Sequence, residues 1–139
     1  MTLEAKLRAA AAAYAPLTAL IGSPPRWWDT QRQQGSAFPS VTVLLVSGNK
    51  TYVFTGRLPT GWSRVQFTIE ADSGEAARGV EAALAAMLDQ ANFVGVPGLA
   101  QYPSRIVLIR GGLNTEMQPG TPGRWWRTVD AMIFSNDNL

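Results

Sequence analysis

The most regular pattern of hydrophobic and polar positions lies between Trp62 and Ala71. Val65, Phe67 and Ile69 recur at every second position, and polar or charged residues stand between them. In an extended chain successive side chains point to opposite faces, so this spacing places the apolar residues on one face. The segment is therefore predicted to be a strand that is buried on one face only.

Other runs of β-forming residues predict the rest of a sheet. They are Ser40–Val46, Thr51–Gly56, Ser104–Arg110 and Arg124–Ser135. The first two are separated by Ser47–Lys50, a tight-turn sequence in which Gly-Asn tolerates positive φ. Three long connections rich in Gly and Pro join the elements, at Gly22–Pro39, Asn92–Pro103 and Gly111–Gly123. Loops of this length in a compact domain usually carry function.

The N-terminal segment has the spacing of an amphipathic helix. Apolar residues recur at three- and four-residue intervals from Thr2 to Tyr14. Pro16 should end this helix or begin a short second turn over Leu17–Ile21, which Gly22 ends.

A second helix is expected to extend to Ala91. Asp72 is its expected N-cap, because Glu75 follows three residues later in a capping-box pattern. Gly79 lies inside this helix, where glycine costs about 1 kcal/mol relative to alanine. We interpret this glycine as a sign of close packing between the helix and the sheet.

These elements predict an α+β fold in the order α-β-β-β-α-β-β. The expected architecture is a single, mostly antiparallel sheet of about five strands with two helices packed on one face. A chain of 139 residues fits one domain, so residues 1–139 are predicted to form a single unit.

Composition changes this picture in one respect, because only 16% of the residues are charged. The average is about 25%, so part of the surface could be covered by partners. The net charge is +2, and the basic residues are scattered rather than gathered in the stripe expected of a nucleic-acid binder. Ten of the twelve basic residues are Arg, which is favoured at interfaces but is equally explained by the codon bias of a GC-rich genome.

Candidate chemistry is sparse. The chain has no His and no Cys, and it lacks phosphate-binding and dinucleotide-binding glycine motifs, so we expect no metal, no cofactor and no enzymatic activity. No apolar run is long enough to span a membrane, and Glu4 interrupts any secretory signal. Glu70 and Asp72 are better explained by a solvated strand edge and a helix cap than by catalysis. Asp130 is interpreted as an exposed residue of the sheet's outer face or as a paired interface charge.

Two tryptophan pairs adjoin arginines, at Trp27-Trp28 and at Trp125-Trp126. Such clusters are compatible with core packing, with a protein interface and with stacking on single-stranded nucleic acid. Trp125 and Trp126 are neighbours in a strand, so they should point to opposite faces. The candidate protein-interface residues are Arg26, Trp27, Trp28, Asp29, Arg57, Phe93, Tyr102, Met117 and Trp125.

Several stretches together resemble a known family. They are the opening Leu3-Glu4-Ala5…Leu7, then Leu17–Gly22, Phe38–Val43, a strand ending at Gly56, Val65–Asp72, an Ala- and Glu-rich helix, and Arg127–Phe134. Over nearly the whole chain this arrangement resembles the tail terminator, or tail completion, proteins of long-tailed bacteriophages and of related prophages and gene transfer agents.

The resemblance implies a structural virion protein that forms a ring, usually hexameric, at the head-proximal end of the tail tube. Such a ring stops polymerisation of the tail-tube protein and binds head-completion or neck proteins. DNA passes through the channel without sequence-specific binding. The implied location is the tail or neck of the virion, with assembly in the host cytoplasm and no membrane.

Three other functions remain open from the sequence. The chain could be a neck or head–tail adaptor protein of similar fold. The Arg and Trp clusters would suit a module that binds single-stranded nucleic acid. An enzyme that uses carboxylates alone would need a pocket around Glu70, Asp72 or Asp130.

Overall fold

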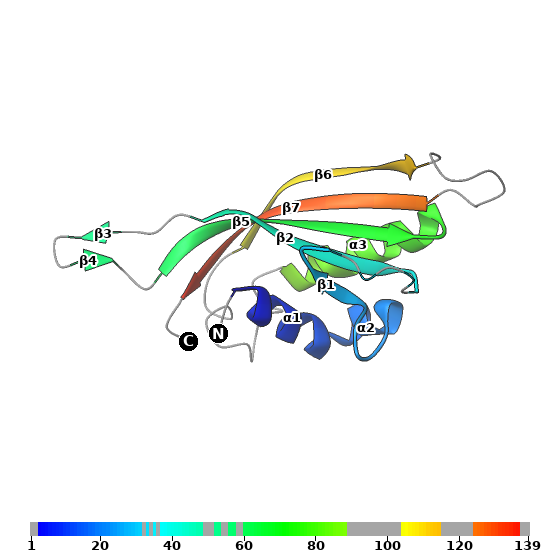
Figure 1. The fold of residues 1–139 in the computed structure, drawn as a ribbon, viewed down its shortest axis with the longest axis horizontal. Helices are drawn as coiled ribbons and strands as arrows, with labels where there is room; N and C mark the ends of the chain where they lie inside the picture. Colours follow the sequence, from blue (N-terminus) through cyan, green and yellow to red (C-terminus); the bar gives the residue numbers. More distant parts are fainter. Residues whose placement is uncertain are drawn as a thin grey trace.

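The computed structural model describes residues 3–31, 33, 35, 37–48, 52–53, 56–57, 60–88, 104–114 and 124–136. Within this part, three helices lie on one side of a mixed sheet (Figure 1). They are α1 (Leu3–Ala13), α2 (Ala15–Ile21) and α3 (Gly74–Leu88). The α+β class predicted from the sequence is therefore confirmed.

The main sheet has the strand order β1-β2-β5-β7-β6. The strands are β1 (Trp27–Asp29), β2 (Ser40–Gly48), β5 (Thr60–Ala71), β7 (Arg124–Asn136) and β6 (Ser104–Asn114). All neighbours are antiparallel except β1 and β2, which are parallel. Two very short strands, β3 (Tyr52–Val53) and β4 (Gly56–Arg57), form a separate sheet at one end of the long axis (Figure 1).

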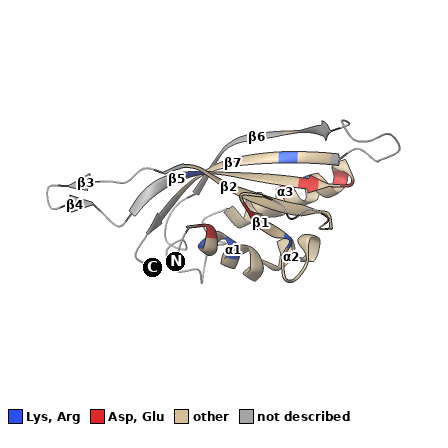
Figure 2. Cartoon of the chain, in the orientation of Figure 1, with Lys and Arg blue, Asp and Glu red and all other residues tan. Residues whose placement is uncertain are grey.

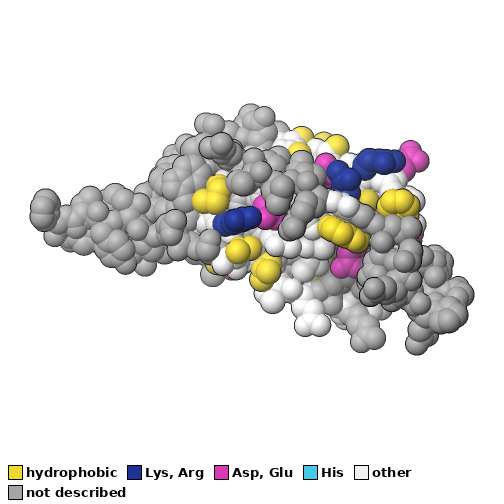
Figure 3. Space-filling view, turned by 90° about the horizontal axis from the view of Figure 1, so that it is seen from above, with side chains coloured by type: hydrophobic (Ala, Val, Ile, Leu, Met, Phe, Trp, Pro, Cys, Tyr) yellow, Lys and Arg dark blue, Asp and Glu magenta, His cyan; other side chains and the backbone are white. Residues whose placement is uncertain are grey.

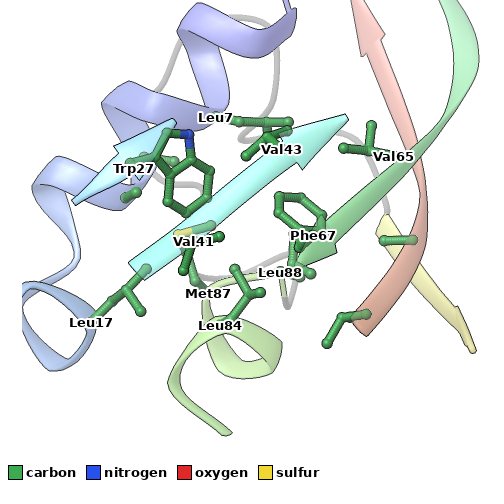
Figure 4. Close-up of a cluster of buried hydrophobic side chains, with 14 of the residues drawn as sticks. Leu7, Leu17, Trp27, Val41, Val43, Val65, Phe67, Leu84, Met87 and Leu88 are labelled. Atoms are coloured by element: carbon green, nitrogen blue, oxygen red, sulfur yellow. The ribbon is translucent and has the colours of Figure 1, made fainter. Parts of the chain in front are cut away.

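The hydrophobic core lies between the sheet and the three helices. Val65, Phe67 and Ile69 of β5 are at most 1% exposed, as the alternation predicted. Figure 4 shows the aromatic side chains of Trp27 and Phe67 among the aliphatic residues that meet them from the helices. The helices contribute Leu7, Ala10, Ala11, Leu17, Ile21, Val80, Leu84, Met87 and Leu88 to this cluster. The polar side chains of β5 therefore lie on the opposite face of the sheet, which we call the outer face.

The start of α3 lies one residue later than the sequence suggested. The Ser73 hydroxyl accepts a hydrogen bond from the backbone N–H of Ala76 at 3.1 Å, so Ser73 is the N-cap. Asp72, the expected N-cap, is exposed and lies before the cap. Either side chain suits a cap, and the backbone geometry decided between them.

The order and membership of the strands differ from the prediction. The expected strand Thr51–Gly56 is wrong, because β3 and β4 pair with each other rather than with the main sheet. Trp27–Asp29 was expected to lie in a connection but forms the edge strand β1. The expected turn at Leu17–Ile21 is part of a full helix, α2, with Pro16 in its first turn.

Three glycines have different surroundings. The inference that Gly79 marks close helix–sheet packing is wrong, because an added Cβ there would meet no atom within 4 Å. Close packing occurs instead at Gly111, where an added Cβ would lie 2.5 Å from Cδ of Arg127. At Gly74, it would lie 3.2 Å from the ring of Trp125. The absence of a side chain thus makes room for a large neighbour at Gly111 and Gly74.

Gly79→Ala should raise the free energy of unfolding by about 0.4–1 kcal/mol, because alanine restricts the unfolded chain and meets open space in the helix. Gly111→Ala should lower it by about 1–3 kcal/mol, because Arg127 must move. Urea unfolding of both variants and the parent chain measures the two changes. A destabilised Gly79→Ala variant would contradict the open environment described for this position.

Candidate protein interface

The tryptophans of β1 point to opposite faces of the sheet. Trp27 pairs in register with Val41 and is 1% exposed, and its ring lies 5.9 Å from that of Phe67. Trp28 pairs in register with Thr42 and is half-buried. Trp27 is therefore a core residue, whereas Trp28 is accessible at the edge of the outer face.

Arg26 is held by the backbone of its own chain. Its Nε donates to the carbonyl of Pro39 at 2.8 Å, and Nη2 donates to the carbonyl of Leu20 at 3.2 Å. Gly22, with a φ of 91°, leaves the space for this side chain, since an added Cβ would lie 2.9 Å from Nη1 of Arg26. Arg26 thus ties the end of α2 to the residue that precedes β2.

Asp29 stands at the end of β1 and forms an ion pair with Arg8 of α1 at 3.1 Å. The two side chains are 41% and 49% exposed. An ion pair this open to water contributes about 0–1 kcal/mol to stability. Asp29 therefore remains accessible to another charged group.

Trp125 of β7 is separated from the β1 tryptophans by β2 and β5, and it lies next to the start of α3. It is 37% exposed and lines a hollow of about 160 Å³ with Gly74, Ala77, Arg78, Gly111 and Arg127. Arg127 is hydrogen-bonded to Glu81 of α3 across this hollow. The register pairs Trp125 with Ala71 and Trp126 with Glu70, so the two tryptophans lie on opposite faces as predicted.

The remaining candidates cannot be placed as side chains. Arg57 belongs to β4, but the structure describes only its backbone. Phe93, Tyr102 and Met117 lie outside the described residues. Of the five candidates whose side chains are described, Trp27 lies in the core, and Trp125 lies on β7 rather than in the segment at β1 that holds the other four. A role for the nine candidates in an interface stays a prediction.

Asp130 lies on the outer face, but the expectation that it is exposed there is wrong, because it is buried in an ion pair with Arg64 of the same chain. Nη2 of Arg64 donates to Oδ2 of Asp130 at 2.8 Å, and the side chains are 41% and 4% exposed. Oδ1 of Asp130 and Nε of Arg64 are buried without a hydrogen-bond partner. The alternation of side chains along each strand predicts that both residues lie on the outer face. Their contact could not be predicted in this way, because it depends on the register between β5 and β7.

Another feature missed from the sequence is an exposed apolar run on β2. Leu44, Leu45 and Val46 are 43%, 41% and 49% exposed. Successive side chains of a strand point to opposite faces, so three consecutive hydrophobic residues cannot all face a core on one side of the sheet. The run of three in the sequence is therefore the pattern that could have indicated exposed apolar residues here. Figure 2 shows no charged residue on the described part of β2.

The described charges on one face of the molecule are mixed in sign. On the surface seen in Figure 3, basic and acidic side chains lie next to each other among hydrophobic ones. The described residues contain no group of three or more potential metal ligands. Within the same part of the chain, no helix is long and apolar enough to cross a bilayer.

Comparisons with known proteins identify a shared fold. No protein-family model and no curated protein matches the chain. Among solved structures, it is similar to a chain of the virion of a native gene transfer agent particle, with a TM-score of 0.62 and 19% identity. The likeness covers 96% of this chain and 95% of that one. At this identity it shows the fold alone.

Trp27→Ala should lower the free energy of unfolding by about 3–5 kcal/mol, because it leaves a cavity in the core. Trp28→Ala should cost clearly less and should impair self-association more than folding. Thermal unfolding and light scattering after size-exclusion chromatography measure the two effects. An equally large loss of stability in both variants would show that Trp28 is also a core residue.

Arg64→Met should lower the free energy of unfolding by about 1 kcal/mol, the low end of the cost of leaving a buried acceptor unpaired. We expect the low end because Arg64 itself is partly exposed to solvent, which screens its charge. Arg8→Met is the matched control and should change stability by no more than about 0.5 kcal/mol, since both members of its pair are exposed. Similar changes in urea unfolding would contradict a special role for the Asp130 pair.

Proposed function

We propose that this chain is a structural virion protein of a phage-like particle. More specifically, it forms a hexameric ring that caps the head-proximal end of the tail tube. The observation that carries the proposal is the likeness to a gene transfer agent virion chain over almost the whole length of both chains. The motifs that resemble tail terminator proteins support the same function.

In this function the protein binds other proteins rather than transforming a substrate. Its ring stops polymerisation of the tail-tube protein and presents a surface to head-completion or neck proteins. The exposed β2 run and the accessible Trp28 and Trp125 supply hydrophobic contact area. Such groups are typical of the buried centre of protein interfaces.

DNA passes through the proposed ring without being read. Three arginines of the described surface are paired with carboxylates: Arg8 with Asp29, Arg64 with Asp130 and Arg127 with Glu81. Paired arginines release fewer counterions on contact with phosphates, so they bind DNA more weakly than free ones. This charge arrangement supports a conduit better than a nucleic-acid-binding module.

The purified chain should form a closed ring that is visible by negative-stain microscopy and has a single mass by native mass spectrometry. Added to polymerising tail-tube protein from the same particle, it should shorten the tubes and sit at one end. A strict monomer that does not associate with tube protein would overturn the proposal. Binding to a head-completion protein without any effect on tubes would instead identify a neck adaptor.

A separate experiment tests the alternative that the chain is a module that binds single-stranded nucleic acid. Gel shifts with short single-stranded oligonucleotides should show no binding at about 150 mM salt. A nucleic-acid-binding groove retains a Kd on the order of 10⁻⁴–10⁻⁶ M at such a salt concentration. Strong, salt-dependent binding would favour a single-strand-binding module.

A further inference from the structure

The main sheet has an open edge beside β1. That short strand pairs with Val41–Val43 of β2, and the backbone N–H of Thr30 makes the last hydrogen bond on this side, to the carbonyl of Val43 at 2.7 Å. Beyond this point, no described strand pairs with the same side of β2. Leu44–Gly48 therefore offers backbone donors and acceptors to an added strand.

This open segment is unusually apolar for an edge. Leu44, Leu45 and Val46 are all more than 40% exposed, and the strand contains no charged residue and no proline. Natural proteins commonly protect exposed edges with charges, prolines or bulges. Here the irregularity between Leu45 and Ser47 is the one such device on this strand. The edge is thus suited to pairing with another chain.

The opposite edge of the same sheet is also open. β6 pairs with β7, and no described strand lies on its other side (Figure 1). Its sequence includes Arg105 and Arg110 and no acidic residue. Asp29, at the end of β1 and next to the open part of β2, is 41% exposed. The two edges are therefore complementary in hydrogen bonding, and no like charges oppose each other on the two strands, because β2 carries none.

We propose that β6 of one copy adds to the open edge of β2 in the next copy. The sheets of neighbouring copies then form one continuous sheet by strand addition. Because two different edges meet, the contact is head-to-tail, and repetition can close into a ring without free edges. This inference rests on the proposed ring and specifies which surfaces form it.

Cysteine cross-linking tests the contact directly, since the chain has no native cysteine. Leu44→Cys protein is mixed with Ile106→Cys, Leu108→Cys or Arg110→Cys protein and oxidised. Disulfides require Cβ atoms about 3.5–4.5 Å apart, so one β6 position should cross-link far more than the others. Ala12→Cys, at an exposed position of α1, is the control and should cross-link with none of them.

A charge placed on the edge provides a second test. Leu45→Lys should raise the Kd of self-association by about tenfold or more, because a buried edge position disfavours a lysine. Thermal stability of the monomer should not change, since Leu45 is exposed. Leu20→Lys is the matched control: Leu20 is 39% exposed on α2, and this variant should associate as the parent chain does.

The outcomes separate this inference from the proposed function. A ring that forms normally with Leu45→Lys, and without β2–β6 cross-links, would overturn the edge pairing and leave the ring intact. Strong cross-linking of Leu44→Cys protein with itself would indicate a two-fold contact and would also overturn the inference. A parent chain that is monomeric at all concentrations would overturn both.

Discussion

The rest of the structure depends on the pairing of β5 with β7. These two strands pair in unbroken register from Thr60 with Asn136 to Ala71 with Trp125. β2 adds to the free side of β5, and β6 adds to the free side of β7. The same pairing aligns Phe67 with Val129, so that one apolar surface faces the helices. On the other face it aligns the residues that form the Arg64–Asp130 ion pair.

Much of this fold could be predicted because it depends on local periodicity. The alternation around Phe67 and the helical spacing of α1 and α3 each report on a single element. β1 could not be predicted, because three residues give no measurable period and its pairing depends on distant Val41. The burial of Lys6, which is 1% exposed, could not be predicted either. A charged residue is expected at the surface, and only the tertiary packing determines that this one is buried.

The candidate interface was predicted less well than the fold. Residue type singled out Trp27 and Trp28 equally, and only the direction of each side chain distinguishes a core residue from an accessible one. Arg26 has the composition of an interface residue but is used to hold its own backbone. The exposure of Leu44 and Leu45 could not be predicted, because the length of the neighbouring strand cannot be read from the sequence. Whether a side chain is accessible depends on which elements pack beside it in the folded chain, and local sequence patterns do not contain this information.

The contact between Gly111 and Arg127 has a consequence for how this sequence can change over time. The space over Gly111 is filled by the side chain of Arg127, which also reaches Glu81 on α3. A larger residue at position 111 requires the side chain of Arg127 to move or position 127 to become smaller, and either change disturbs the contact with Glu81. These three positions are thus expected to vary together among homologous chains, as a linked set that joins the edge strand to the helix layer.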